Sequence, residues 1–311
     1  MKIAMMGAGG VGGFFGAHLA RAGCDVTFIA RGAHLQAMRE RGLTVESPAQ
    51  GDIHIPAVKV TDDPESVGVV DIVILSVKLW DTESAARSIA PMVGPATGVL
   101  SLQNGVIKDD ILRSVFPARQ VMGGVAYVAT SVARPGVIHQ TGTMQRIVVG
   151  EYDQATSERA RFLHEALLAA GITAELSADV RRSLWEKYVF LVGLSGTTAT
   201  TRLPLGAVRA HPRTRAFLQD LMQETVTVGR AHGVALPEDY ARQRMAFADT
   251  LPYDMTSSMH HDLQRGNPLE VEWLSGGVVQ LGQAKGIDTP VNRGVWDALA
   301  LHAQGAKRAA A

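Results

Sequence analysis

The first residues of the chain carry glycines at a spacing suited to holding a diphosphate. In MKIAMMGAGGVGGFFG, Gly7, Gly9 and Gly12 form the pattern G-x-G-x-x-G between a strand-like and a helical segment. The first glycine permits a tight turn, the second lets backbone amides approach the phosphates, and the third lets helix and strand pack closely. The start of the helix favours the anion. A merely glycine-rich turn is the alternative, but the context predicts that a dinucleotide binds to a loop made of Gly7, Ala8, Gly9, Gly10, Val11 and Gly12.

Polar side chains follow three other predicted strands. They are Arg31 after Asp25–Ala30, Lys78 after Asp71–Val77 and Asn104 after Gly98–Leu102. In an open parallel sheet the ligand crevice lies outside the carboxyl ends of the strands. We therefore expect the glycine loop and these three side chains to line one edge of one cleft.

An arginine stands where many dinucleotide sites carry a carboxylate. An acidic side chain after the second strand would grip the adenosine ribose hydroxyl of NAD, whereas the guanidinium of Arg31 can pair with a 2′-phosphate. The sequence thus favours NADP(H) over NAD(H). The alternative interpretations are that Arg31 and Lys78 are solvated cations and that Asn104-Gly105 is only a tight turn.

The second half of the chain offers a candidate proton donor. A predicted helix becomes almost wholly apolar after Lys187, and such a helix is usually buried. An ammonium partly removed from water has a lowered pKa, which suits a general acid near neutral pH. The alternative is that the Lys187 side chain extends to solvent.

Another predicted helix begins near Ser258, and Glu270 lies 12 residues later. Ser257 or Ser258 could be only a helix cap, and Asp262 and Glu270 only surface carboxylates. The adjacent His260 and His261 point in different directions on a helix and lack a partner at i, i+4. We expect no metal site among the ten histidines and the single cysteine.

The elements that must position these residues fall into two groups. Up to residue 178, β-type segments alternate with helical ones, which is typical of a parallel sheet with helices on its faces, and residues 120–151 resemble an antiparallel pair. After residue 179 only helical patterns follow, at 180–199, 213–232, 237–250, 257–265, 269–285 and 290–304. The sequence predicts an α/β domain of Rossmann type over 1–178 and an all-α substrate and dimerisation domain over 179–311, whose alanine-rich end should fray.

Composition excludes several classes of protein. The 30 basic and 30 acidic residues of the 311 balance, which argues against binding to nucleic acid or to an anionic membrane. No apolar run approaches the roughly 20 residues of a membrane-spanning helix. A single cysteine, Cys24, and the lack of a secretion signal at the start of the sequence lead us to expect a cytoplasmic protein. We expect a small molecule as its partner, with a homodimer formed through the helical domain.

Taken together, these motifs resemble the ketopantoate reductase (2-dehydropantoate 2-reductase) family over nearly the full length of the chain. The resemblance is carried by the glycine loop with Arg31, Ser76-Val77-Lys78, Gln103-Asn104-Gly105, Leu184-Trp185-Glu186-Lys187, Ser257-Ser258-Met259 with Asp262, and Glu270.

That resemblance implies a reaction and a role for each residue. The reaction is NADPH-dependent reduction of a 2-oxo acid, with ketopantoate to pantoate, a step of pantothenate biosynthesis, as the best candidate. The family implies that Lys187 protonates the forming alkoxide and that Asn104 lies beside nicotinamide and substrate. It also implies that Ser258 contacts the substrate carboxylate and that Glu270 contacts the substrate hydroxyl and the lysine.

The sequence departs from the family on one helix. Leu191 and Ser195 stand four and eight residues after Lys187, where the family pattern carries substrate-holding asparagines. Ser195 keeps a hydroxyl and stays among the predicted substrate contacts, but a leucine makes no hydrogen bond. A reductase of another, more apolar 2-oxo acid is therefore an alternative, as are an opine-type dehydrogenase and a non-catalytic protein that responds to NADPH.

Overall fold

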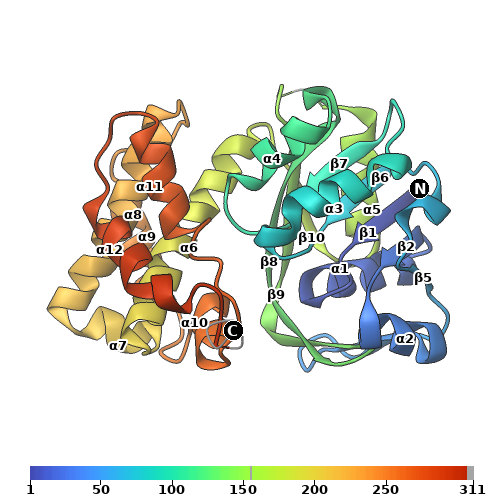
Figure 1. Ribbon diagram of the computed structural model, residues 1–311, viewed down its shortest axis with the longest axis horizontal. Coiled ribbons are helices and arrows are strands. Elements are labelled where there is room, and N and C mark those ends of the chain that lie inside the picture. The colour runs from blue at the N-terminus through green and yellow to red at the C-terminus, as the bar shows by residue number, and fades with distance from the viewer. Residues whose placement is uncertain (155, 307–311) are drawn as a thin grey trace. The chain divides into compact units, whose positions relative to one another are not determined.

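The computed structural model describes residues 1–154 and 156–306, which form two compact units. The first unit consists of Met1–Asn104 and Lys108–Ser183, and the second of Gly105–Ile107 and Leu184–Ala311. Most of the alanine-rich end, which we expect to fray, lies outside the described residues. The predicted fold class, α/β followed by all-α, is confirmed (Figure 1).

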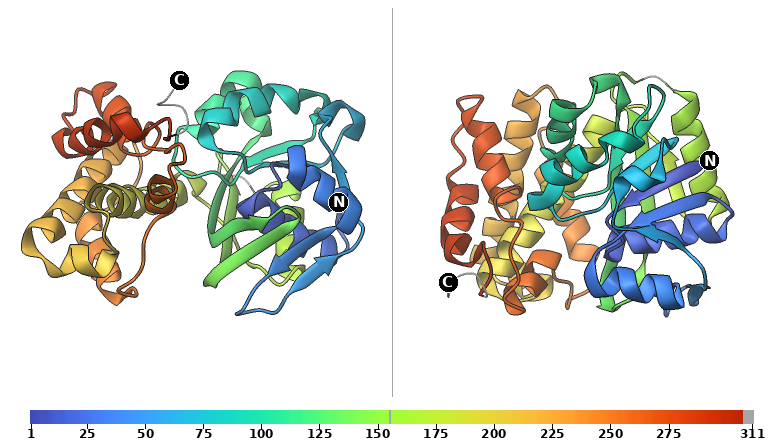
Figure 2. Two further views of the ribbon diagram at one scale, coloured as in Figure 1. Left: turned by 60° about the horizontal axis from the view of Figure 1, so that its bottom comes forward. Right: turned by 45° about the vertical axis from the view of Figure 1, so that its right-hand side comes forward.

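The first unit is built on one mixed sheet. Its strand order is β4-β3-β9-β8-β7-β6-β1-β2-β5, and β10 pairs with β9. The strands from β7 to β5 in this order pair in parallel, as predicted, and β8 and β9 form the long antiparallel hairpin drawn in green in Figure 2. The strands are β1 (Lys2–Met6), β2 (Asp25–Ile29), β3 (Leu43–Glu46), β4 (Ile53–Ile55), β5 (Lys59–Thr61), β6 (Ile72–Leu75), β7 (Gly98–Ser101), β8 (Val121–Arg134), β9 (Val137–Glu151) and β10 (Thr173–Leu176).

Alternation along the strands gives this sheet two apolar faces. In β1, Ile3 and Met5 belong to one buried cluster, with residues of α1, α2 and α5, whereas Ala4 and Met6 belong to another, with residues of α3 and α4. Because these strands are buried on both faces, their sequences are nearly continuous hydrophobic runs. The helices are α1 (Gly10–Arg21), α2 (Gly32–Arg41), α3 (Thr82–Ser88), α4 (Lys108–Val115) and α5 (Glu158–Ala169).

Among its described residues the second unit contains helices and no strand. The first of them, α6, begins at Val180 in the first unit and runs through the second, where its apolar residues enter a separate buried cluster. The helices are α6 (Val180–Thr201), α7 (Leu205–Ala210), α8 (Pro212–Ala231), α9 (Tyr240–Thr250), α10 (Ser258–Gln264), α11 (Ser275–Gln283) and α12 (Pro290–Leu299).

Several elements differ from the prediction. The helix predicted over 269–285 starts only at Ser275, because Leu274 has a non-helical ψ of −96°, and before it the Trp273 and Leu274 amides form a turn on the Glu270 carbonyl. The helix predicted over 290–304 ends at Leu299 and continues as a short 3₁₀ turn. The elements α2, α4, α7 and β3–β5 are not among those predicted. They are short, and α2 is mostly polar with few buried residues.

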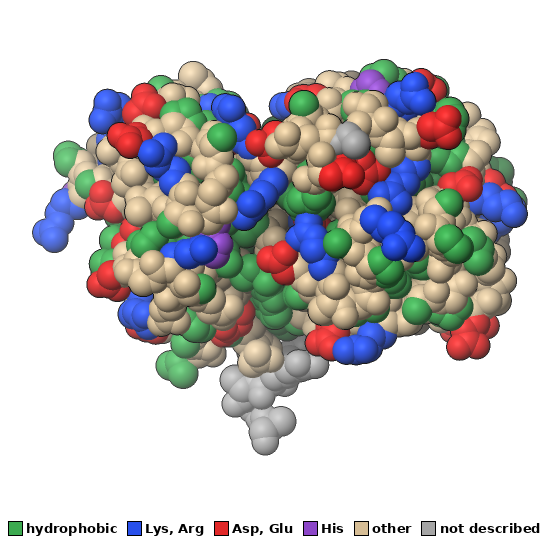
Figure 3. Space-filling view, turned by 90° about the horizontal axis from the view of Figure 1, so that it is seen from above, with side chains coloured by type: hydrophobic (Ala, Val, Ile, Leu, Met, Phe, Trp, Pro, Cys, Tyr) green, Lys and Arg blue, Asp and Glu red, His purple; other side chains and the backbone are tan. Residues whose placement is uncertain are grey.

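The surface carries both signs of charge. On the face drawn in Figure 3, basic and acidic side chains are interspersed over both units, and neither sign forms a large continuous patch. Within the described part of the chain, no helix is both long and apolar enough to cross a membrane.

Candidate active site

The carboxyl ends of four parallel strands meet at one edge of the sheet. Met6, at the end of β1, pairs with Ile29 of β2 and with Leu75 of β6, and Leu75 pairs with Ser101 of β7. The Ser76 amide then donates to the Met6 carbonyl at 2.8 Å, so the alignment continues beyond the strands. The glycine loop and the three polar residues that follow the other strands therefore share this edge, as the sequence predicts.

Three glycines of the loop are required by packing within the protein. A Cβ added at Gly12 would lie 2.1 Å from the Gly7 carbonyl oxygen, and one at Gly7 would lie 2.9 Å from the Val77 side chain. Gly7 also has a φ of +97°, a conformation that other residues rarely adopt. A Cβ at Gly10 would lie 2.7 Å from the Thr130 carbonyl oxygen of β8. These positions need glycine for the fold itself.

Gly9 is different, because the protein leaves space beside it. A Cβ there would have no protein atom within 4 Å, and its φ of −70° suits any residue. Gly9 precedes α1, which has no acidic residue in its first turn, and the amide end of a helix attracts anions. Neither packing nor backbone conformation demands glycine here, whereas close approach of a phosphate would. The loop thus fits the diphosphate of a dinucleotide.

This contrast predicts opposite effects for two alanine substitutions. We expect Gly9→Ala to leave the melting temperature of the protein unchanged. The Kd for NADPH should rise at least about tenfold, which is about 1.4 kcal/mol of binding free energy, because the added methyl group occupies the space proposed for a phosphate. Gly12→Ala should instead lower the free energy of unfolding by about 1–3 kcal/mol or more through overpacking. Thermal unfolding and fluorescence titration with NADPH measure both. Unchanged NADPH affinity in Gly9→Ala would contradict a diphosphate site at this loop.

His34 fastens the glycine loop to a distant turn. Its Nε2 lies 2.8 Å from the Ala8 carbonyl oxygen, and the Gly136 amide donates to its Nδ1 at 3.0 Å. Because Nδ1 accepts, the proton of the neutral ring must lie on Nε2, which donates to Ala8. Burial lowers the pKa of His34, so the ring is neutral at pH 7. No sequence pattern points to His34, because both of its partners are backbone groups remote in sequence.

Arg31 is exposed at the point where the chain passes from β2 to α2. Its backbone caps α2, and no carboxylate of the described residues pairs with its guanidinium. Arg39, on the same helix, by contrast pairs with Asp62 at 3.0 Å. The Arg31 side chain therefore remains available to an anionic group at this edge.

The other two strand-end residues differ in exposure. Lys78 is exposed and precedes a short 3₁₀ helix, η2 (Leu79–Asp81), and its ammonium lies 5.6 Å from the centroid of the Trp80 ring, within the range of a cation–π contact. Asn104 is half-buried and is followed by Gly105, whose φ is +81°. One cation and one amide thus complete this edge of the sheet.

In the second unit, Lys187 lies half-buried on α6 beside a buried tyrosine. The Tyr188 hydroxyl donates to the carbonyls of Trp273 and Leu274 at 3.0 and 2.7 Å. The amides of these two residues donate in turn to the Glu270 carbonyl, both at 3.1 Å. The part of α6 that carries Lys187 is therefore fastened to the turn that begins at the buried Glu270.

A second set of contacts fastens α6 to α10. The hydroxyls of Thr198 and Ser257 lie 2.9 Å apart, and Ser257 Oγ accepts the His260 amide at 3.1 Å. His260 Nδ1 donates to the Thr198 carbonyl at 2.8 Å. Of the two adjacent serines, Ser257 is thus the helix cap, and Ser258 is exposed as the first residue of α10.

The positions that depart from the family pattern lie farther along α6. Leu191 is half-buried and packs against the apolar cluster of this unit. Ser195 is fully buried, and its hydroxyl has no hydrogen-bond partner among the described residues. The side of α6 that continues from Lys187 is therefore less polar than two asparagines would make it.

Comparison with known proteins identifies relatives over almost the whole chain. Residues 3–154 match the model of the ketopantoate reductase PanE/ApbA family, and residues 179–303 match the model of its C-terminal region. A 2-dehydropantoate 2-reductase from Mesorhizobium japonicum is 32% identical over 93% of this chain and 94% of its own length. YkpB of Bacillus subtilis, described as an uncharacterized oxidoreductase, is 29% identical over 97% of this chain and 99% of its own.

Solved structures agree with these sequence matches. The crystal structure of a PanE/ApbA family ketopantoate reductase from Ralstonia eutropha has a TM-score of 0.88 and 37% identity to this chain. The alignment covers 97% of this chain and 98% of that one. The glycine loop, the strand-end edge and the helical unit occur together here, and the matches span both units. The chain therefore belongs to the ketopantoate reductase family of oxidoreductases.

Proposed function

We propose that the protein reduces a 2-oxo acid to the corresponding 2-hydroxy acid with NADPH, and that 2-dehydropantoate is its substrate. The observation that carries this proposal is the open space at Gly9, at the edge of the sheet that also carries Arg31, Lys78 and Asn104. Membership of the family and the names of its curated relatives support the choice of substrate.

Each group then has a defined task. The glycine loop and Arg31 hold the diphosphate and the 2′-phosphate, and Asn104 orients the nicotinamide end and the substrate. NADPH, when bound, supplies the hydride. Lys187 Nζ gives its proton to the carbonyl oxygen as negative charge develops there, which stabilises the transition state more than the ground state.

The remaining groups of the second unit bind the substrate. Ser258 donates to the substrate carboxylate, Glu270 accepts from the hydroxyl that forms and orients the ammonium of Lys187, and Ser195 supplies a further hydroxyl. The burial of Glu270 favours this role, because a carboxylate away from bulk water interacts more strongly with a nearby ammonium.

A second candidate substrate is a 2-oxo acid with an apolar side chain. Leu191 packs within an apolar cluster and cannot make the hydrogen bond that an asparagine would make to a substrate hydroxyl. Leaving a buried polar group without its partner costs about 1–3 kcal/mol. A substrate without that hydroxyl avoids this cost.

NADPH oxidation at 340 nm, measured over a panel of 2-oxo acids, tests the proposal. 2-Dehydropantoate should give the highest kcat/KM, and an apolar 2-oxo acid in first place would identify the second candidate. Turnover only when an amino acid is added would identify an opine-type dehydrogenase. Binding of NADPH without oxidation by any compound would identify a non-catalytic protein.

Cofactor preference provides a separate test. We expect Arg31→Ala to raise the Kd for NADPH by roughly 10- to 150-fold, the equivalent of a charged hydrogen bond, with the Kd for NADH nearly unchanged. Arg39→Ala is the matched control, since this arginine lies on α2, the helix that Arg31 caps, but pairs with Asp62; both affinities should stay the same. Equal losses for NADPH and NADH in Arg31→Ala would refute the contact with the 2′-phosphate.

A further inference from the structure

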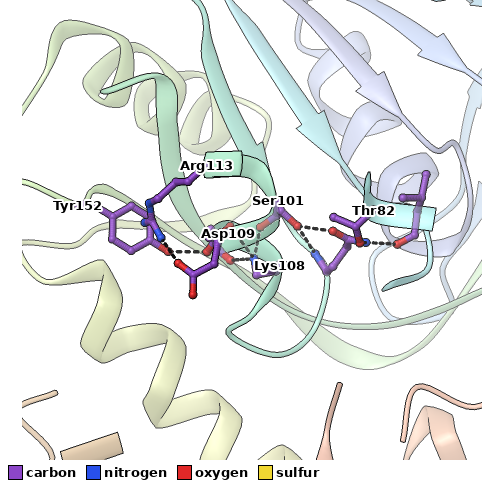
Figure 4. Close-up of polar contacts among 10 residues, drawn as sticks. Thr82, Ser101, Lys108, Asp109, Arg113 and Tyr152 are labelled. Atoms are coloured by element: carbon purple, nitrogen blue, oxygen red, sulfur yellow. Dashed lines mark hydrogen bonds and ion pairs between the residues drawn. The ribbon is translucent and has the colours of Figure 1, made fainter. Parts of the chain in front are cut away.

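A buried polar network lies directly behind the strand-end edge, and none of the roles above uses it (Figure 4). Ser101, the last residue of β7, is at its centre. The Ser101 hydroxyl donates to the side-chain oxygen Oε1 of Gln103 at 2.8 Å and accepts from the backbone amide of Gln103 at 3.2 Å. The Ser101 carbonyl accepts from the Lys108 ammonium. One residue thus fixes both ends of the segment between positions 103 and 108.

The Gln103 side chain also reaches the neighbouring strand. Its Nε2 donates to the Val77 carbonyl at 3.0 Å and to Thr82 Oγ1 at 2.8 Å, and the Thr82 hydroxyl donates to the Leu79 carbonyl at 2.7 Å. In the sequence these partners lie on both sides of Lys78. One buried amide group therefore links the loop that carries Lys78 to the loop that carries Asn104.

Lys108 anchors the far end of the second loop. Its fully buried ammonium donates to the Gly124 carbonyl of β8 at 2.9 Å as well as to the Ser101 carbonyl. Asn104 lies within a segment whose two ends are both tied to the sheet by buried side chains. Such anchoring restricts where the Asn104 side chain can lie.

Folding alone does not require this arrangement at the carboxyl ends of the strands. Burying an amide is costly unless every donor and acceptor is satisfied, and an apolar residue of similar volume would fill the space without that requirement. Among the described residues, the side-chain amide of Gln103, which itself precedes Asn104, meets the requirement through the Val77 carbonyl before Lys78, the Thr82 hydroxyl after it, and the Ser101 hydroxyl at the end of β7. Its contacts therefore serve the relative placement of these loops.

We propose that Gln103 is a positioning residue for the reduction: its amide sets the spacing between the Lys78 and Asn104 loops, and so holds the nicotinamide end of the cofactor. The inference rests on the proposed function, in which Asn104 orients that end and Lys78 lies at the same edge of the sheet. It predicts that disturbing Gln103 affects the nicotinamide half of NADPH and spares the adenosine half, because Arg31 and the glycine loop follow other strands.

The test compares NADPH with 2′-phospho-ADP-ribose, which lacks the nicotinamide. Gln103→Leu should lower kcat on the order of 10²-fold, as a misplacement of about 1 Å can do. It should also weaken NADPH several-fold and leave the affinity for the fragment unchanged. Thr82→Val removes one partner of the amide and should show the same split to a smaller extent, and it decides the question if Gln103→Leu does not fold.

Gln120→Leu is the matched control. Gln120 is equally buried and donates its Nε2 to the Gly94 carbonyl at 2.7 Å, but it lies at the amino end of β8. This variant should lose stability and keep kcat and both affinities. Wild-type kcat in Gln103→Leu, equal loss of NADPH and fragment, or an equal fall of kcat in Gln120→Leu would each overturn the proposal. The binding comparison needs no turnover, so it stands apart from the outcome of the substrate panel.

Discussion

Replacing Lys187 by alanine is expected to lower kcat for reduction of the 2-oxo acid by about 10²–10⁴-fold, the usual contribution of one general acid. The Kd for NADPH should stay nearly constant, because the groups proposed to hold the cofactor belong to the first unit. Steady-state NADPH oxidation and fluorescence titration measure the two quantities separately. The combination would identify Lys187 as a group that acts on the reacting oxygen.

One further variant separates proton transfer from charge, and another is a control. Lys187→Arg keeps a positive charge, but a guanidinium holds its proton far too tightly to transfer it near neutral pH, so kcat should remain low. Lys285→Ala removes an exposed lysine of the same unit and should leave kcat unchanged. If Lys187→Ala turns over at the wild-type rate, Lys187 has no part in the mechanism.

Replacing Lys108 by methionine is expected to cost about 3–5 kcal/mol of the free energy of unfolding, as breaking a buried charge pair usually does. Its Nζ lies 3.9 Å from Asp109 Oδ1, and both side chains are buried. Burial lowers the pKa of Lys108 and raises that of Asp109, so each charge depends on the other. The variant leaves the Asp109 carboxylate without this cation and leaves two backbone carbonyls without their donor.

A double-mutant cycle isolates the pair. Asp109→Asn keeps an acceptor for the Tyr152 hydroxyl, which donates to Asp109 Oδ2. Lys108→Met combined with Asp109→Asn should lose clearly less than the sum of the single losses, since no uncompensated charge remains. Lys59→Met, which breaks an exposed pair with Asp25, is the control and should change stability little. Additive losses in chemical denaturation would contradict a coupled pair.

The features predicted from the sequence are those that depend on neighbours in the chain. The spacing of Gly7, Gly9 and Gly12 and the apolar runs that became β1, β2, β6 and β7 are local signals, and the parallel pairing of these strands brings their carboxyl ends to one edge. For the same reason the two-part fold class could be predicted from the change in periodicity near residue 179.

The features that escaped prediction depend on partners remote in sequence. Lys108 and Asp109 would ordinarily be assigned to the surface, since charged residues are rarely buried, and only the completed sheet encloses them. Gln103 was identified only as part of a motif, because its partners lie 21 and 26 residues away. Glu270 was expected within a helix, and the turn that holds it is formed with the help of Tyr188 from α6.

The segment Gly105–Ile107 has a consequence for how this protein can be divided. It comes from the middle of the first half of the chain, yet Val106 packs on the apolar cluster of the helical unit, and Ile107 Cδ1 lies 3.0 Å from where a Cβ of Gly277 would stand. A fragment starting at residue 184 would therefore lack part of its own interior. The two halves are not interchangeable cassettes, so a chimera that joins this helical half to a relative's α/β half must carry these three residues with it.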